Sequence, residues 1–191
     1  RRFWTMIAHS HGQLWNASKI AGSLGISAPT ARSYIDILEE TFIVRQIQPY
    51  YSNVKKRLIK SSRVYIRDSG LLHALLNIRT NEDLHSHPSL GSSWEGFIAG
   101  QIIGMLPDGW QAFFYRTGAG AEIDIVLLDR HKPTAVEVKY SLSPKVERGF
   151  WNAYEDLSCK RGYVVYPGAE SYPLGKNVFT LPVKDLANIF D

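Results

Sequence analysis

The chain has 191 residues, of which 45% are hydrophobic and 12% aromatic, enough for one large core or two small ones. Its single cysteine, Cys159, excludes an internal disulfide and a multi-cysteine zinc site, and no apolar run approaches the length that spans a membrane. These features indicate a cytoplasmic protein. The start at Arg1, without an initiator Met and already in helical register, indicates a piece of a longer protein.

The net charge of +4 is unevenly distributed along the chain. Residues 1–79 carry 12 Lys and Arg against 4 Asp and Glu, whereas residues 80–191 carry 10 against 14. A basic first half and an acidic second half predict two modules, which we place at residues 1–80 and 81–191. The first module is a candidate for contact with a polyanion.

Three helices are predicted in the first module. The first covers residues 1–11, and the second covers residues 16–25 with Asn16 as its N-cap. The third follows a tight turn, with Ser27 as its cap, Pro29 in its first turn and an inward stripe of Ala31, Ile35 and Leu38. Two short helices joined by a turn that contains glycine predict a helix-turn-helix.

Strands are expected at residues 42–51 and 63–67, so the helices are followed by a two-stranded ribbon, as in a winged helix. Such modules place the second helix of the motif in the major groove, while basic residues beside it hold phosphates. The groove-facing candidates are Arg32 and Ser33. The candidates for contact with the phosphates of the DNA backbone are Lys55, Lys56, Arg57 and Lys60.

A second interpretation of this module stays open. A winged helix can serve only to pack domains together, and a run of basic residues can be a solvated hairpin tip. Beyond the ribbon, a helix at residues 71–77 with Asp68 as its cap leads into a polar stretch, residues 80–93, which we predict to be the linker. Two histidine pairs, His9 with His11 and His85 with His87, lack a further ligand at known spacing and are interpreted as surface residues.

The second module predicts a helix at residues 92–106, three strands at 112–116, 122–128 and 134–140, a helix at 143–157, and short strands at 162–166 and 178–181. The order of these elements predicts a mixed sheet flanked by helices. The predicted fold class is therefore α/β, of the α+β kind.

The second and third strands carry charges in an otherwise apolar sheet. Glu122 shares one face with Asp124, and Glu137 shares one with Lys139, because strand side chains alternate. If the two strands pair as a hairpin, Asp124, Glu137 and Lys139 converge at one edge. Charges in such a place are costly unless they pair with one another or with a metal. Both a functional site and an ion-pair network fit this pattern.

The order of elements, with Glu95, Asp124 and Glu137-Val138-Lys139, resembles the restriction-endonuclease-like fold and its PD-(D/E)xK signature. The resemblance implies that Asp124 and Glu137 hold Mg²⁺ or Mn²⁺, that Lys139 positions the attacking water, and that Glu95 completes the site. Hard oxygen ligands and a nearby ammonium group suit this chemistry.

Two neighbouring residues and one departure qualify this resemblance. Glu122 is an optional further metal ligand, and Arg116 either contacts a phosphate or pairs with Glu122 across the hairpin. Ile123 stands where the family often has proline. The alternative is a catalytically inactive relative whose charges form a network among themselves.

A longer resemblance covers nearly the whole chain. Residues 60–76, residues 91–97, and the segments around Arg116, Glu122-Ile123-Asp124 and Glu137-Val138-Lys139 resemble the C-terminal part of a large prokaryotic group of AAA+-type ATPases, known as domain of unknown function 4143. The resemblance implies an ATPase domain before Arg1. No P-loop motif occurs here, and Gly118-Ala119-Gly120 leads into a strand, so we expect no nucleotide site in this segment.

These observations lead to two expectations. The first is a DNA-interacting winged helix joined to a Mg²⁺-dependent nuclease-like domain, both serving an upstream ATPase domain. The second is an inactive nuclease-fold module that docks DNA or a partner protein for that ATPase. Neither involves a membrane.

Overall fold

The computed structural model describes residues 1–51 and 58–190, which fold as two compact units. The first unit comprises Arg1–Ile47 and Ser61–Phe97, and the second comprises Gln48–Lys60 and Ile98–Asp191. The chain therefore passes between the units three times, whereas the sequence predicted a single boundary after residue 80.

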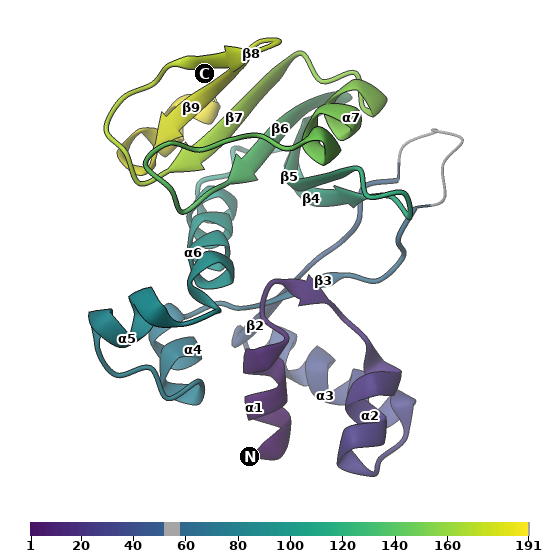
Figure 1. Ribbon diagram of the computed structural model, residues 1–191. Coiled ribbons are helices and arrows are strands. Elements are labelled where there is room, and N and C mark those ends of the chain that lie inside the picture. Colours follow the sequence, from purple (N-terminus) through teal and green to yellow (C-terminus); the bar gives the residue numbers. More distant parts are fainter. Residues whose placement is uncertain (52–57, 191) are drawn as a thin grey trace. The chain divides into compact units, whose positions relative to one another are not determined.

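The first unit contains five helices, three short strands and the beginning of a sixth helix among its described residues (Figure 1). These elements are α1 (Arg2–His9), β1 (Gln13–Leu14), α2 (Ala17–Leu24), α3 (Ala28–Glu40), β2 (Val44–Ile47), β3 (Arg63–Ile66), α4 (Ser69–Leu75), α5 (Asn81–Ser86) and α6 (Leu90–Gly104). The strands form an antiparallel sheet in the order β1-β3-β2. Helices followed by an antiparallel pair of strands are the order that the sequence predicted.

Side-chain caps define where α2 and α3 begin. The Asn16 side chain accepts a hydrogen bond from the backbone N–H of Lys19 at 2.9 Å, and the Ser27 hydroxyl accepts one from that of Thr30 at 3.2 Å. Each cap satisfies a helix N–H that has no partner within the helix. Both predicted caps and both predicted helices are confirmed, and the inward stripe of α3 is buried.

Helix α3 ends in a conformation that explains why β2 begins later than predicted. The N–H of Ile43 bonds to the carbonyl of Leu38, and that of Phe42 bonds to the carbonyl of Glu39. This is the pattern of a helix end whose last residue is left-handed, and Phe42 accordingly has a φ of 59°. Phe42 therefore belongs to the helix end and not to the strand.

The stretch predicted as a linker contains a helix, so that prediction was wrong. Thr80 and Asp83 form a reciprocal capping box at the start of α5, and α6 then begins at Leu90. None of the residues of α5 is buried, so its sequence has no apolar periodicity that could have revealed it.

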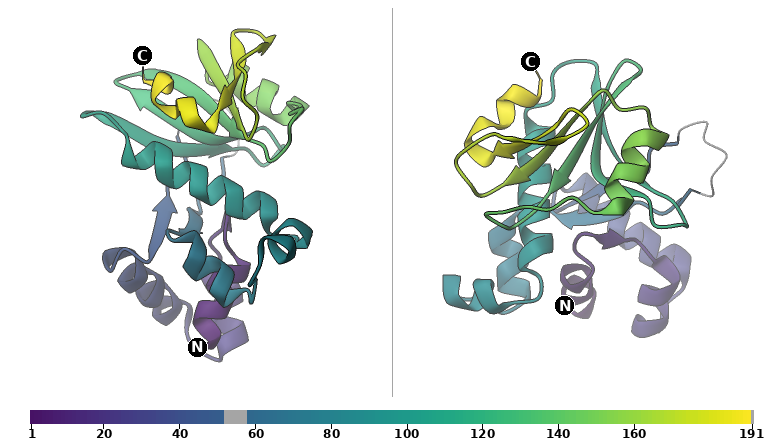
Figure 2. Two further views of the ribbon diagram at one scale, coloured as in Figure 1. Left: turned by 90° about the vertical axis from the view of Figure 1, so that its left-hand side faces the viewer. Right: turned by 45° about the horizontal axis from the view of Figure 1, so that its top comes forward.

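The second unit is built on a six-stranded mixed sheet (Figures 1 and 2). Its elements are β4 (Trp110–Arg116), β5 (Glu122–Asp129), β6 (Lys132–Val138), α7 (Arg148–Asp156), β7 (Arg161–Tyr166), β8 (Pro173–Gly175), β9 (Val178–Pro182) and the 3₁₀-helix η1 (Val183–Ile189). The strand order is β4-β5-β6-β7-β9-β8, with parallel pairing of β6 with β7 and of β7 with β9. The predicted mixed α/β class is confirmed.

Apolar side chains from the sheet and from α7 form the core of this unit. Phe150, Ala153 and Tyr154 of α7 pack with Ile123 and Val126 of β5. Helix α7 begins at Arg148, five residues later than predicted. None of the helices in the described ranges is both long and apolar enough to cross a membrane.

His11 is buried, so its interpretation as a surface residue was wrong. Its side chain is only 4% exposed, and its Nδ1 accepts a hydrogen bond from the N–H of Ile66 at 3.0 Å. Because a backbone N–H can only donate, Nδ1 carries no proton, and Nε2–H donates to the Ser92 carbonyl at 3.1 Å. Burial lowers the pKa of His11 to about 4, although the bond to Ser92 opposes this shift.

Helix α6 comes close to His11 at Gly96. A Cβ at this position would lie 2.3 Å from His11 Nε2, and the ring is fixed by two hydrogen bonds. We expect Gly96→Ala to lower the free energy of unfolding by about 1–3 kcal/mol through overpacking, despite the better helix propensity of alanine. Gly104→Ala is the control on the same helix, because nothing lies within 4 Å of its Cβ. Urea unfolding of both variants tests this, and equal stabilities would contradict it.

The neutral state of His11 predicts acid sensitivity. Its folded pKa of about 4 lies below the unfolded value of 6.5, so the stability it contributes is present above pH 6.5 and is lost as the pH falls toward 4. The free energy of unfolding should fall by about 3 kcal/mol between pH 7 and pH 4 on account of this group. Urea titrations across this range measure the loss. His11→Gln should flatten the pH dependence and the exposed control His9→Gln should not; the same slope in both would contradict the assignment.

Candidate functional site

The candidate site lies where β6 separates from β5. The antiparallel pairing of the two strands ends at Ile125 and Val136, while β6 continues beside β7. The N–H of Val138 would lose its strand partner there, and instead it donates to Oδ2 of Asp124 at 3.0 Å. The carboxylate of Asp124 is thereby fixed at the end of β6, beside Glu137 and Lys139.

Glu137 and Lys139 form an ion pair at this point. The Lys139 ammonium lies 2.8 Å from Oε1 of Glu137, whose residue is only 7% exposed. Burial alone would lower the pKa of Lys139, but the negative charges of Glu137, then Asp124 and Glu147, raise it. Lys139 therefore carries its positive charge throughout the physiological pH range. The structure brings together the three residues that the sequence predicted to converge.

Glu147 is a further charge near Lys139 that the sequence analysis missed. It occupies the N-cap position of α7, yet its side chain makes no capping hydrogen bond. Gly149, two residues later, approaches the β4–β5 turn so closely that a Cβ there would lie 2.7 Å from the Gly120 carbonyl oxygen. The predicted helix at residues 143–157 contains Glu147, and the only signal in the sequence for its N-cap position is that it precedes the apolar stripe of α7.

Arg116 and Glu122 pair across the hairpin of β4 and β5. They face each other in the strand register, and the guanidinium lies 3.4 Å from Oε1 of Glu122. This pairing was one of the two alternatives predicted from the sequence. Both side chains are partly exposed, so the pair adds little stability.

Glu95 belongs to the first unit and has partners there. Its Oε1 accepts hydrogen bonds from Nη1 of Arg63 at 2.8 Å and from the Tyr65 hydroxyl at 2.5 Å. Arg63 is only 3% exposed, so Glu95 neutralises a buried positive charge. This contact links α6 to β3. The role of Glu95 as an auxiliary metal ligand stays a prediction.

The described residues contain no group of three His, Cys, Asp or Glu side chains that could hold a metal ion. Two carboxylates, those of Asp124 and Glu137, flank the end of β6. Mg²⁺ is commonly held by one or two carboxylates together with waters and substrate phosphates. The donor set therefore fits a Mg²⁺ ion that a phosphate group helps to bind.

The residues predicted to contact nucleic acid are only partly described. Arg32 and Ser33 are exposed on α3, and Lys60 is exposed shortly before β3. Lys55, Lys56 and Arg57 lie outside the described residues. All of these contacts stay predictions.

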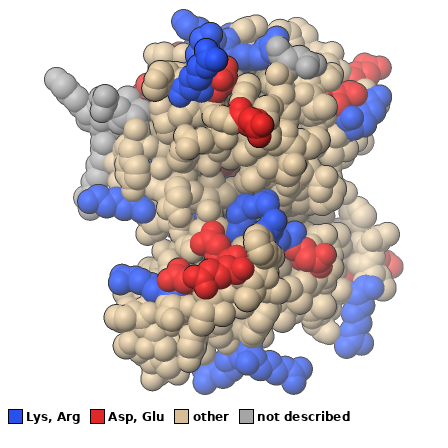
Figure 3. All heavy atoms as spheres, turned by 180° about the vertical axis from the view of Figure 1, so that it is seen from behind, with Lys and Arg blue, Asp and Glu red and all other residues tan. Residues whose placement is uncertain are grey.

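The units divide the charge differently from the two halves of the sequence. The first unit has 8 Lys and Arg against 7 Asp and Glu, a net charge of +1, and the second has 14 against 11, a net charge of +3. Of the net charge of +8 in residues 1–79, +4 lies in Gln48–Lys60, which belongs to the second unit, and Glu82, Asp83 and Glu95 lower the charge of the first unit further. Figure 3 shows one face of the molecule, on which basic and acidic side chains alternate in small groups.

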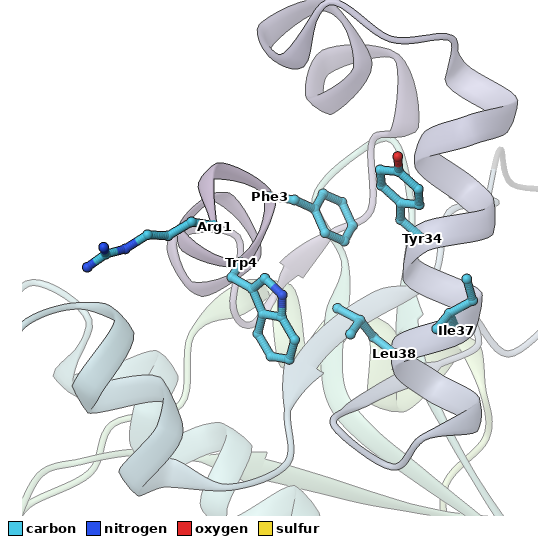
Figure 4. A pocket seen from close by; sticks show the side chains of 6 residues that line it. All are labelled: Arg1, Phe3, Trp4, Tyr34, Ile37 and Leu38. Atoms are coloured by element: carbon cyan, nitrogen blue, oxygen red, sulfur yellow. The ribbon is translucent and has the colours of Figure 1, made fainter.

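The outward side of α3 is partly apolar. Tyr34 is 43% exposed and Ile37 is 51% exposed. They border a groove of about 250 Å³ between α1 and α3, and the Phe3 ring meets the Tyr34 ring edge-on at 5.4 Å (Figure 4). The groove is lined by Arg1, Phe3, Trp4, Tyr34, Ile37 and Leu38. The exposed side of α3 therefore carries apolar side chains beside Arg32 and Ser33.

The chain matches two protein families. Residues 90–186 match the domain of unknown function DUF4143, and residues 1–82 match the domain of unknown function DUF8612. The chain belongs to the DUF4143 family, as its motifs predicted. No solved structure matches it.

Two mycobacterial proteins are similar to nearly the whole chain. They are the uncharacterized protein Rv2008c of Mycobacterium tuberculosis and the uncharacterized protein Mb2031c of Mycobacterium bovis, each 39% identical over 186 residues. The match covers 97% of this chain but 42% of each relative. The chain thus spans less than half the length of the curated relatives that it matches.

Proposed function

We propose that the chain is the C-terminal part of a cytoplasmic AAA+-type ATPase that acts on DNA, and that its second unit hydrolyses phosphodiester bonds with Mg²⁺. The observation that carries this proposal is the meeting of Asp124, Glu137 and Lys139 at the end of β6. The family resemblance implies the upstream ATPase domain, and the additional length of the two relatives leaves room for one.

In this function Asp124 and Glu137 would hold the ion through carboxylate oxygens. The bound metal would lower the pKa of a water ligand and neutralise charge on the phosphodiester. The backbone N–H of Val138 orients Asp124 for this role through the bond to Oδ2. Glu95 and Glu122 are the additional ligand candidates that the resemblance and the strand pattern supply.

Lys139 would act as a fixed cation and not as a base. Its raised pKa keeps the ammonium protonated, so it can orient the attacking water and stabilise negative charge in the transition state. Arg116 would contact a neighbouring phosphate by leaving its partly exposed pair with Glu122.

A second candidate function rests on the ion pair itself. The Lys139 ammonium already satisfies Glu137 at 2.8 Å, which is the arrangement expected of an inactive relative whose charges neutralise one another. In that case the fold is a docking module that binds DNA or a partner protein for the ATPase.

Carboxylate substitutions test the nuclease proposal. We expect the protein to cleave plasmid or branched DNA with Mg²⁺ or Mn²⁺, and Asp124→Asn or Glu137→Gln to reduce the cleavage rate at least about 100-fold, because each removes a metal ligand. Glu155→Gln is the matched control, since Glu155 pairs with Lys176 at an exposed position of the same unit. Cleavage is measured on gels. Absence of cleavage by the wild type, or equal rates in all variants, would falsify the proposal.

Substitution of Lys139 separates the two candidates. If Lys139 stabilises the transition state, Lys139→Gln should lower the cleavage rate by about 10²–10³-fold at temperatures where the variant stays folded, in addition to the stability lost with the Glu137 pair. If it only neutralises Glu137, the main effect is a loss of stability, because a buried carboxylate is left without its cation. Parallel measurements of cleavage rate and of thermal unfolding decide between these results.

A further inference from the structure

The ribbon of β2 and β3 in the first unit places three arginines close together. Three ribbon residues point into the core of the unit, namely Val44, Val64 and Ile66. Because strand side chains alternate, the residues between and after them share the other face. These are Arg45 on β2 and Arg63, Tyr65 and Arg67 along β3 and its end.

One of these arginines has a carboxylate partner. Arg63 is bound by Glu95 at 2.8 Å. Neither Arg45 nor Arg67 forms an ion pair anywhere in the part of the chain that the structure describes. The first unit has nearly as many acidic as basic residues, so a shortage of carboxylates does not explain why Arg45 and Arg67 lack a partner.

The carboxylates that lie near the ribbon are engaged elsewhere. Glu39 accepts hydrogen bonds from the N–H and the side-chain amide of Gln46, at 2.9 and 2.7 Å. Asp68, which follows Arg67 in the chain, caps α4 by accepting from the N–H of Leu71 at 2.6 Å. Arg45 and Arg67 therefore have no counter-ion in the described residues.

Arg45 and Arg67 occupy diagonal positions across the two strands. Arg45 faces Tyr65 in the register, and Arg67 lies two residues further along the same strand direction, with its N–H bonded to the carbonyl of Ile43. Such diagonal positions on one face are within reach of long side chains. Burial, and then the charge of Arg67, lower the pKa of Arg45, so the two positive charges lie within range of mutual repulsion. A bound oxyanion would relieve this repulsion.

An exposed aromatic ring completes the cluster. Phe42 is 72% exposed, and the Arg67 guanidinium lies over its ring at 5.2 Å from the centroid. Phe42 also has a φ of 59° at the end of α3, a left-handed position where glycine is favoured and a bulky residue is strained. A large apolar side chain is thus held in solvent at a position where folding alone favours glycine.

We propose that Phe42, Arg45 and Arg67 form a binding site for single-stranded nucleic acid. The two guanidinium groups hold backbone phosphates, and the Phe42 ring stacks on a base. An arginine guanidinium can donate two parallel hydrogen bonds to phosphate oxygens. Proteins that bind single strands commonly stack an unpaired base on an exposed aromatic ring beside positive charge. In a duplex the bases are stacked inside, so the Phe42 ring would have no base face to contact. The site lies in the first unit and does not depend on the proposed metal site.

The test measures binding of a fluorescein-labelled oligothymidylate by anisotropy at several salt concentrations. We expect Phe42→Gly to weaken binding about ten-fold or more through lost stacking, while its melting temperature stays the same or rises because the strain is relieved. The double change Arg45→Gln with Arg67→Gln should reduce the slope of log K against log salt by about 1.4, since each phosphate contact on a single strand contributes about 0.7. Lys19→Gln removes one charge from the exposed surface of α2 in the same unit, and is the control.

Two results would overturn this assignment. One is oligonucleotide binding by the Phe42 and arginine variants that equals binding by Lys19→Gln. The other is an acidic, tryptophan-containing peptide that binds the wild type more tightly than the oligonucleotide, which would make the site a protein-docking site. If the wild type binds the oligonucleotide but cleaves no DNA with Mg²⁺ or Mn²⁺, the nuclease proposal is rejected and this site is retained.

Discussion

The hydrogen bond from the N–H of Val138 to the carboxylate of Asp124 is the contact on which the candidate site depends. It forms because β6 loses β5 as a partner before it loses β7, and the free N–H needs an acceptor. Since the acceptor is a carboxylate, the same bond that completes the sheet also holds a negative charge beside Glu137 and Lys139. The site is therefore a product of how the sheet ends, and both candidate functions begin from this geometry.

The charges around Lys139 explain why one arrangement supports two functions. The Lys139 ammonium binds Glu137 and is also attracted by the negative charges of Asp124 and Glu147. Its positive charge is therefore stabilised without any bound ligand. The same positive charge would also stabilise the negative charge that develops on a phosphodiester in the transition state of cleavage. The difference between the two functions is whether a metal ion can compete with Lys139 for the carboxylates, and this is a question of relative affinity.

The first unit shows how a linear charge pattern can mislead. The sequence suggested a basic module, but the structure assigns the basic stretch of Gln48–Lys60 to the second unit and the acidic Glu82, Asp83 and Glu95 to the first, which is therefore nearly neutral. Its unusual features are instead local, namely the apolar groove beside α3 and two ribbon arginines, Arg45 and Arg67, that have no counter-ion among the described residues. Local features of this kind suit contacts with individual phosphate groups or bases of a ligand. Long-range attraction of a polyanion instead needs many positive charges spread over the surface.

The sequence by itself determined the elements whose signals are local. Asn16, Ser27 and Asp68 act as helix caps, because a cap needs only its own side chain and an N–H three residues on. The alternation of β5 and β6 placed Asp124, Glu137 and Lys139 correctly, since strand periodicity fixes which residues share a face. The fold class followed from the order of these elements.

Only the tertiary structure decided the rest. Helix α5 has no buried face and thus no apolar pattern, and the burial of His11 depends on β3 and α6, which are far from it in sequence. The partners of Glu95 are likewise distant in the chain, at Arg63 and Tyr65. Periodicity and capping are properties of a few consecutive residues, whereas the environment of a charge is set by whichever segments the fold brings beside it.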